Sequence, residues 1–298
     1  MQNPKLWSAA LAIACAALAT PASAQNARSW VSSTGADGNS CLRAAPCATF
    51  GGALTKTAIG GLISCADPGD YGTSTITQSV TIDCVEGFAN VVGIVINIPT
   101  SSPSDANRTV NLRGLAVVGN GSSPLAGIEV LGSAAVNIDH VHIYGGYVRG
   151  LYDHRSDGAG SLLVSNSLIE SNTLGTVIVS PGFVEAVFDN VRSTANTYGL
   201  AVGARTAVAV RNSVFSANTT GLEGDTGAQI TVEHSTVAHN AIGIESNFSV
   251  RLSNSDVAFN STGVQGTAAT FGNNRFSGNS IDGTLTAVGT ASSDLGQR

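Results

Sequence analysis

Short stretches in which apolar and polar residues alternate recur along the chain at nearly constant spacing. Each stretch ends at an anchor, an Asn or a His, and a second Asn and a Gly follow at fixed distances. The anchors of the regular region are Asn166, Asn190, Asn212, His234, Asn254 and Asn274, which stand 24, 22, 22, 20 and 20 residues apart. Alternation with a period of two predicts a strand that buries one face. Repetition of such a unit at a fixed period predicts a solenoid.

Three apolar positions in each repeat predict the cross-section of this solenoid. The first lies in the alternating stretch, as at Val208 and Val210, the second follows the anchor, as at Phe215, and the third follows the Gly, as at Leu222. We therefore expect three short strands per turn, each stacked about 4.8 Å from its equivalent in the next turn and in parallel register. Less regular anchors at Cys84, Gly114 and His140 precede the six, and nine anchors predict an all-β coil of about nine turns.

The second Asn of each repeat, as at Asn196, Asn218 and Asn240, is predicted to stand at a tight corner between two strands. Asn tolerates the left-handed backbone conformation that such a corner requires. Stacked Asn amides can also hydrogen-bond to one another along a column. We expect an internal ladder of Asn side chains with a structural role.

The phrase Asn212–Gly221, of the form N-S-x-F-x-x-N-x-x-G, resembles the repeat of right-handed parallel β-helix proteins of the pectin-lyase-like superfamily. The segments Phe50–Leu54, Gly60–Ile63, Pro68–Tyr71 and Ser79–Ile82 resemble the entry to the coil in these proteins. The resemblance covers essentially the whole chain after residue 24 and implies a single-stranded, right-handed parallel β-helix. It implies little about function, since the superfamily includes lyases, hydrolases, epimerases, phage tailspikes and adhesins.

The N-terminal sequence predicts an exported protein. Residues 1–24 have the form of a signal peptide, with a positive charge at Lys5, an apolar run from Trp7 to Ala19 and a cleavage sequence at Ala22–Ala24. The apolar run is too short to span a membrane. A lipoprotein cleaved at Cys15 is a less well matched alternative. We expect a secreted or periplasmic protein, cleaved near Ala24 and without a membrane span.

Four cysteines follow the predicted signal peptide. An even number in an exported protein indicates two disulfides, for which three pairings exist. We favour Cys41–Cys47, which closes a short loop, and Cys65–Cys84, whose separation of 19 residues is close to one turn. Metal binding is the alternative, but the Cys-x-x-Cys spacing is absent, and we assign no metal ligands.

The remainder of the chain is predicted to divide into three parts. Residues 25–60 form a disulfide-containing N-terminal cap, residues 61–288 the β-helix and residues 289–298 a polar tail. A short capping helix is predicted over Ala48–Ala58, with Ala53 and Leu54 facing inward. Such a helix covers strand edges that could otherwise pair with another chain.

The charge balance limits the class of partner. With 14 basic and 20 acidic residues the formal net charge is −6 at pH 7. An acidic chain is a poor match for nucleic acid or for an anionic membrane surface. A polysaccharide or a cell-surface glycan is the partner we expect, and the oligomeric state stays open.

The densest cluster of chemically versatile side chains lies between Asp139 and Asp157. Tyrosine faces stack on sugar rings, histidine transfers protons near neutral pH and arginine grips carboxylates. The alternative is a polar surface segment that binds no ligand, in which His140 replaces an anchor Asn, as His234 does. We expect ligand contacts from Asp139, His140, Tyr144, Tyr147, Tyr152, Arg155 and Asp157.

A catalytic role is the second hypothesis. A polysaccharide lyase or uronate epimerase would remove the proton α to a uronate carboxylate and stabilise the enolate, and its candidate residues are His142, Arg149, Asp153 and His154. Such an acidic enzyme would use Ca²⁺; otherwise no cofactor is expected. The motifs of polygalacturonases and pectate lyases are absent. We therefore favour a non-catalytic carbohydrate-binding or surface module over a lyase, epimerase or glycoside hydrolase, with a structural or adhesive solenoid as a further alternative.

Two sets of charged residues are expected to stack on successive turns. Asp189, Arg211 and Glu233 precede successive anchors and would form a ladder of alternating sign. Glu223 and Glu245 would lie about 5 Å apart on adjacent turns. Two carboxylates at such a short distance raise each other's pKa or bind a cation, and retaining glycosidases use a similar separation. A solvated acidic stripe is the interpretation we favour.

Overall fold

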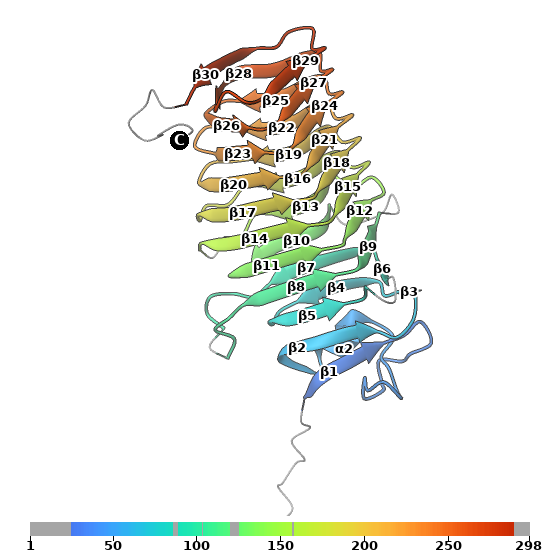
Figure 1. The fold of residues 1–298 in the computed structure, drawn as a ribbon. Helices are drawn as coiled ribbons and strands as arrows, with labels where there is room; N and C mark the ends of the chain where they lie inside the picture. The colour runs from blue at the N-terminus through green and yellow to red at the C-terminus, as the bar shows by residue number, and fades with distance from the viewer. Residues whose placement is uncertain (1–24, 86–88, 103, 120–124, 157, 289–298) are drawn as a thin grey trace, which may run out of the picture.

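The alternating stretches form parallel strands that stack into a right-handed β-helix of about nine turns (Figure 1). The predicted fold class is therefore confirmed. The computed structural model describes residues 25–85, 89–102, 104–119, 125–156 and 158–288. The predicted signal peptide over residues 1–24 and the tail over residues 289–298 lie outside the described residues. Among the described residues, the structure contains no helix with the length and hydropathy needed to traverse a bilayer.

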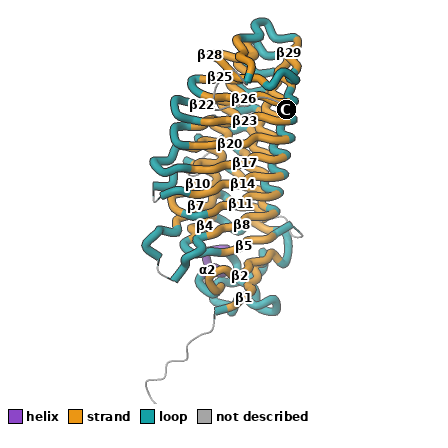
Figure 2. The backbone as a smooth tube through the Cα atoms, turned by 60° about the vertical axis from the view of Figure 1, so that its left-hand side comes forward, coloured by secondary structure: helices purple, strands orange, loops and turns teal. Residues whose placement is uncertain are grey.

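Three faces run along the column, and strands of successive turns stack on each of them (Figure 1). Figure 2 shows two of these stacks side by side. Face 1 comprises β1 (Asn26–Val31), β2 (Thr57–Cys65), β5 (Val80–Asp83), β8 (Thr109–Arg113), β11 (Ala135–Asp139), β14 (Gly160–Ser165), β17 (Val184–Asp189), β20 (Thr206–Arg211), β23 (Gln229–Glu233), β26 (Ser249–Ser253) and β30 (Thr284–Ala287). Face 2, which follows each anchor, comprises β3 (Gly69–Asp70), β6 (Ala89–Val91), β9 (Leu115–Val118), β12 (His142–Tyr144), β15 (Leu168–Glu170), β18 (Arg192–Thr194), β21 (Val214–Ser216), β24 (Thr236–Ala238), β27 (Asp256–Ala258) and β29 (Arg275–Ser277).

Face 3 completes each turn. It comprises β4 (Thr73–Ile76), β7 (Gly93–Asn97), β10 (Ala126–Gly132), β13 (Arg149–Asp153), β16 (Leu174–Ile178), β19 (Tyr198–Val202), β22 (Thr220–Gly224) and β25 (Ile242–Ser246). The last long strand, β28 (Thr262–Thr270), begins on face 3 beside β25 and ends on face 1 beside β26. This strand therefore joins the two faces at the C-terminal end of the column.

The core is a narrow column because every face contributes alternate residues to it. On face 1 the register places Val208 directly opposite Ile230, and both are buried. Phe215 on face 2 and Leu222 on face 3 are buried at the same level. The repeated Gly permits close packing: a Cβ on Gly221 would lie 2.6 Å from the carbonyl oxygen of Gly243. The three predicted apolar positions thus form the interior.

Left-handed backbone conformations occur at two places in each regular turn. Anchors adopt them, with φ of 49° at Asn212 and 47° at His234. The other left-handed residue is the one before the second Asn, for example Ala217 with φ of 56°. The prediction that the second Asn itself is left-handed is therefore wrong. Its preceding neighbour makes the turn, which directs the Asn side chain into the column.

The predicted Asn ladder is present between faces 2 and 3. Asn196 Nδ2 donates to Asn218 Oδ1 at 3.2 Å, and Asn218 Nδ2 donates to Asn240 Oδ1 at 3.3 Å. Backbone N–H groups of the same residues donate to the same oxygens. All three side chains are buried, so the ladder satisfies polar groups that water cannot reach.

The N-terminal cap holds the only helix of the described residues, α2 (Phe50–Leu54). The Thr49 side chain caps it by accepting from the Gly52 N–H, and Phe50, Ala53 and Leu54 are buried. The helix is shorter than predicted because the chain enters β2 at Thr57.

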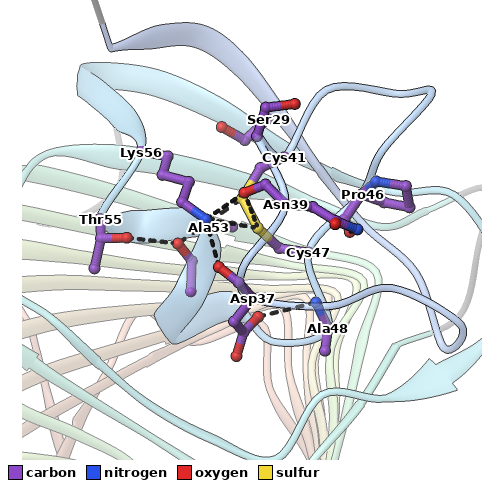
Figure 3. Close-up of a disulfide and its surroundings, with 12 residues drawn as sticks. Ser29, Asp37, Asn39, Cys41, Pro46, Cys47, Ala48, Ala53, Thr55 and Lys56 are labelled. Atoms are coloured by element: carbon purple, nitrogen blue, oxygen red, sulfur yellow. Dashed lines mark hydrogen bonds between the residues drawn. A yellow bond between two sulfur atoms is a disulfide. The ribbon is translucent and has the colours of Figure 1, made fainter. Parts of the chain in front are cut away.

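Both predicted disulfides, Cys41–Cys47 and Cys65–Cys84, are present. Figure 3 shows Lys56 Nζ reaching the backbone carbonyls of Asp37 and Asn39 beside the first disulfide. Disulfides are typical of oxidising compartments. The pair of disulfides is therefore consistent with an extracellular or periplasmic protein.

Candidate functional site

The residues between Asp139 and Asp157 are distributed around the whole turn. Asp139 ends β11 on face 1, and His140 forms the following corner with φ of 52°. His142 and Tyr144 are half-buried on face 2. Asp157 lies outside the described residues. The remaining candidates belong to face 3, where Arg149, Tyr152 and His154 are half-buried, or to the interior, where Tyr147, Asp153 and Arg155 are buried.

The interior group is held by hydrogen bonds and an ion pair. The Tyr147 hydroxyl donates to the Val92 carbonyl. Arg155 Nε and Nη2 donate to the two carboxylate oxygens of Asp153 at 2.9 and 2.5 Å, and both side chains are fully buried. The expected ligand contacts of Tyr147 and Arg155, and the expected catalytic role of Asp153, do not match these positions. Side chains alternate along a strand, so Asp153 points inward between the outward-facing Tyr152 and His154.

Outward-facing side chains on β13 and β10 form a stacked row on face 3. The Arg149 Cζ atom lies 4.4 Å from the centroid of the Tyr152 ring. Tyr152 in turn stacks on His154, with centroids 4.0 Å apart and an interplanar angle of 12°. His154 Nε2 lies 2.9 Å from Glu129 Oε1. Arg149 Nε is buried without a hydrogen-bond partner among the described residues.

A hollow of about 290 Å³ adjoins this row across β16, β19 and β22. Its lining includes Leu174, Val177, Tyr198, Ala201 and Glu223. The register places Arg149 beside Leu174 and Tyr152 beside Val177, and Leu174 lies beside Tyr198 on the next strand. We call the stacked row and the hollow together the face-3 groove (Glu129, Arg149, Tyr152, His154, Leu174, Val177, Tyr198, Ala201 and Glu223).

Sequence reasoning did not select Leu174, Val177 or Tyr198. A signal was present, because Arg149, Leu174 and Tyr198 each directly precede the repeated Gly of their turn. Aligning that one position across the repeats places the three side chains in a vertical column. Leu174 and Tyr198 are half-buried at that position.

Carboxylates accumulate at the far end of the groove. Glu223 lies directly opposite Glu245, as predicted. Burial raises the pKa of Glu223, and the charges of Glu245 and Asp225 raise it further. The negative charge of Glu223, together with burial, raises the pKa of Tyr198. The Tyr198 hydroxyl therefore keeps its proton and can donate a hydrogen bond.

Replacing Glu223 by Gln is expected to raise the free energy of unfolding at pH 7 by a few tenths to about 1 kcal/mol, because like charges directly opposite each other destabilise a sheet. The folded-state pKa of Glu223 lies above its unfolded value, so the native state binds the proton more tightly. The Glu223 charge therefore destabilises the wild-type protein at any pH above its raised folded-state pKa. This destabilisation disappears as the pH falls below the pKa of Glu in the unfolded chain, about 4. Urea unfolding at several pH values measures this difference.

Glu185→Gln provides the control for that experiment. Glu185 is exposed on face 1 and lies opposite Ser161 and Ala207, neither of which is charged. An equal gain at pH 7 in this variant, or a gain for Glu223→Gln that does not decline at low pH, would contradict the explanation.

The other predicted charge ladder is aligned but not paired. Asp189, Arg211 and Glu233 are direct neighbours in register, yet no ion pair joins them in the described part of the chain. Their side chains are solvated and gain little from pairing. Arg113 instead pairs with Asp83 at 2.9 Å and with Asp139 at 3.4 Å.

A second hollow, of about 380 Å³, lies at the corner between faces 1 and 2, and we call it the corner hollow. His140 and His142 line it together with Val85, Asn166 and Leu168. His142 Nε2 lies 2.8 Å from Glu170 Oε1, and His140 Nδ1 lies 2.9 Å from Asp139 Oδ2. Imidazoles oriented by carboxylates can accept a proton from a substrate.

Asp139 is the best-anchored carboxylate near the corner hollow. Partial burial by itself would raise its pKa. Hydrogen bonds from Asn166, His140 and Ser165 outweigh burial and lower the pKa of this carboxyl to about 2. Asp139 is therefore ionised at every pH at which the protein is expected to work.

The four candidate catalytic residues do not share one surface. His142 lies on face 2, Arg149 and His154 on face 3, and Asp153 inside the column. Ca²⁺ was expected only for a lyase. In the residues that the structure describes, no three His, Cys, Asp or Glu side chains converge as metal ligands.

Comparisons with known proteins agree with the fold. A family model described as a right handed beta helix region matches residues 126–290, more than half of the chain. The crystal structure of pectate lyase Pel9A is similar to this one, with a TM-score of 0.62 over 88% of this chain and 78% of that chain. Sequence identity is 14%, so this likeness concerns the fold alone. No curated protein matches the sequence.

Proposed function

Because the chain belongs to the right-handed β-helix family, we propose that it is an exported, non-catalytic module that binds a glycan in the face-3 groove. Solenoids present long continuous surfaces of this kind to their ligands. One observation carries the proposal: Tyr198 and Glu223 line an apolar hollow, and Tyr152 and Arg149 lie beside its Val177 and Leu174 on the neighbouring strand.

The composition of the groove suits a sugar. Sugar rings have apolar C–H faces and a rim of hydroxyl groups, and ligand sites combine apolar walls with a few polar groups. Leu174, Val177 and Ala201 supply the apolar floor, while Tyr198 adds an aromatic ring with a hydroxyl. Glu223 can accept hydrogen bonds from sugar hydroxyls. These groups lie on three consecutive strands, so a polymer can follow the column at about 4.8 Å per turn.

Arg149 gives the strongest local sign of a missing partner. Its guanidinium is stacked on Tyr152, and its Nε donor is buried without an acceptor among the described residues. A buried unsatisfied donor is costly, and a hydrogen bond to a charged donor is stronger than a neutral one. A ligand oxygen would satisfy this donor once a shift of the Arg149 side chain exposed it to the groove. The similar solved structure is named a pectate lyase, which favours a polysaccharide as the source of that oxygen.

Tyr198→Ala and Tyr152→Ala are each expected to weaken glycan binding about tenfold, which corresponds to about 1.4 kcal/mol. A glycan array identifies the ligand, and calorimetry with that ligand measures the affinity of each variant. Tyr144→Ala is the control, because Tyr144 is a surface tyrosine that stacks on His142 on face 2. Equal losses in all three variants would contradict the face-3 site. Absence of binding to any glycan would favour a structural or adhesive column.

One observation favours a polysaccharide lyase or uronate epimerase as the second candidate function. Glu170 holds His142 through Nε2 at 2.8 Å, which leaves Nδ1 to take the proton α to a substrate carboxylate. Glu170 would stabilise the imidazolium that forms. In a lyase the carbanion then expels the glycosidic oxygen from the β carbon and leaves a C=C bond, whereas in an epimerase the same carbon takes a proton on its other face. Unsaturated product, measured by ultraviolet absorbance, or epimerised uronate, measured by NMR, should be lost in His142→Gln and retained in His154→Gln. Product formation by both variants would remove this candidate.

A further inference from the structure

A third hollow, of about 260 Å³, lies on face 1 at the N-terminal end of the column. Its lining includes Arg28, Trp30, Ser64, Asp83 and Arg113. Parallel register builds it from successive turns: Trp30 lies beside Ser64, Ser64 beside Asp83, and Asp83 beside Arg113. The face-3 groove does not include any of these residues.

Two guanidinium groups lie against the ring of Trp30. The Cζ atom of Arg28 is 4.3 Å from the ring centroid and that of Arg43 is 5.0 Å away. Attraction to an aromatic face holds a guanidinium plane in a defined orientation. Arg28 lines the hollow, whereas Arg43 belongs to the loop between Cys41 and Cys47 and adds positive charge beside the hollow.

The hydrogen bonds of Arg28 show an unused binding geometry. Its Nε and Nη2 atoms both donate to the same oxygen, Ser64 Oγ, at 3.2 and 3.0 Å. This fork of donors matches the paired oxygens of a carboxylate or phosphate. A single neutral hydroxyl therefore occupies a position suited to two oxygens that carry charge.

The arginines at the hollow differ in whether they have a counter-charge. Arg113 is paired with Asp83 and Asp139. Neither Arg28 nor Arg43 forms an ion pair with any residue that the structure describes, and both are exposed. The protein as a whole has a formal net charge of −6. Two unpaired arginines on one tryptophan are thus a local positive site on an acidic molecule.

We propose that Arg28, Arg43, Trp30 and Ser64 form a binding site for an oxyanion group of a ligand, which is a carboxylate, a sulfate or a phosphate. Arg28 grips two of its oxygens, Arg43 attracts it electrostatically from beside the hollow, and the Ser64 hydroxyl donates once its own oxygen is released. Trp30 fixes the orientation of the guanidiniums before the ligand arrives, which lowers the entropic cost of binding. This site goes beyond the proposed glycan groove and does not depend on it.

Tryptophan fluorescence reports directly on this site. The chain contains two tryptophans, Trp7 and Trp30, so Trp7→Phe in the full chain leaves Trp30 as the only emitter. Sodium sulfate, phosphate and glucuronate are titrated separately against sodium chloride of equal ionic strength. We expect a saturable change in Trp30 emission. Saturation by all three identifies the oxyanion as sufficient, whereas saturation by glucuronate alone identifies a sugar acid.

Arg28→Gln and Arg43→Gln are each expected to weaken that binding at least tenfold, measured by calorimetry because these substitutions also alter Trp30 emission. Arg211→Gln is the matched control, since Arg211 is exposed on the same face and is unpaired among the described residues. The proposal would be overturned if Trp30 emission changed without saturation, as it does in chloride. Wild-type affinity for the oxyanion in both Arg28→Gln and Arg43→Gln would also overturn it. Glycan-array results do not affect either outcome.

Discussion

Replacing Asp153 by Asn is expected to lower the free energy of unfolding by about 3–5 kcal/mol, because the substitution leaves a buried arginine without its counter-charge. Arg155 donates to both carboxylate oxygens of Asp153, and neither side chain is exposed. The carbonyl of Ser133 also accepts from Arg155 at 3.0 Å, but a carbonyl has no net charge. An Asn amide at position 153 would keep at most one of the two acceptors.

Urea unfolding, followed by circular dichroism and by Trp30 fluorescence, measures the loss. Two probes are required because solenoids can unfold in stages. Asp83→Asn is the control: it removes the solvated ion pair with Arg113, which should cost less than about 1 kcal/mol. The double variant Asp153→Leu with Arg155→Met should recover most of the lost stability, because apolar residues of similar volume can replace a buried ion pair. A single-variant loss no larger than that of the control would contradict the interpretation.

Replacing Asn218 by Ala is expected to cost about 2–4 kcal/mol, because each buried polar group left without a partner costs about 1–3 kcal/mol. Asn218 Oδ1 accepts from the Asn196 backbone N–H at 3.0 Å and from Asn196 Nδ2. Asn218 Nδ2 donates to the Ser193 carbonyl at 3.0 Å. Alanine removes the amide that satisfies these groups.

Asn212→Gly tests whether the ladder, rather than any asparagine of the turn, supplies this stability. Asn212 belongs to the same turn but is exposed, and its φ of 49° suits glycine. Its one side-chain hydrogen bond, to Asp189 Oδ1, is solvated. We expect a change of less than about 1 kcal/mol in urea unfolding. Equal losses in the two variants would show that the ladder has no special role.

The turn that contains the predicted ligand cluster shows how far sequence reasoning could reach. Gly221 stands nine positions after Asn212 in a regular repeat, whereas Gly150 stands ten positions after His140. The extra residue lies in a corner with two left-handed glycines, Gly145 and Gly146. Since a shift of one residue exchanges the two sides of a strand, counting from the anchor gives the wrong side for β13, whereas counting from Gly150 gives the right one.

Tyr147 illustrates the consequence of that shift. Its backbone N–H donates to Asn172 Oδ1 at 3.3 Å, just as the Asn172 N–H donates to Asn196 Oδ1 on the next turn. Tyr147 therefore occupies the ladder position of its turn. A residue chosen as a ligand contact for its aromatic ring has a structural role because of its register.

The sequence by itself determined the parallel coil, the stacking of Glu223 on Glu245 and the Asn ladder, and it favoured the two disulfides among three possible pairings. The coil, the stacking and the ladder depend only on the repeat spacing, which makes residues about one turn apart into vertical neighbours. Tertiary structure alone decided which side chains point outward where the spacing changes, and it placed Asp153 and Arg155 inside. It also decided which residues from different turns surround one hollow, because Tyr152, Leu174 and Tyr198, or Arg28, Trp30 and Ser64, become neighbours only when the column is wound.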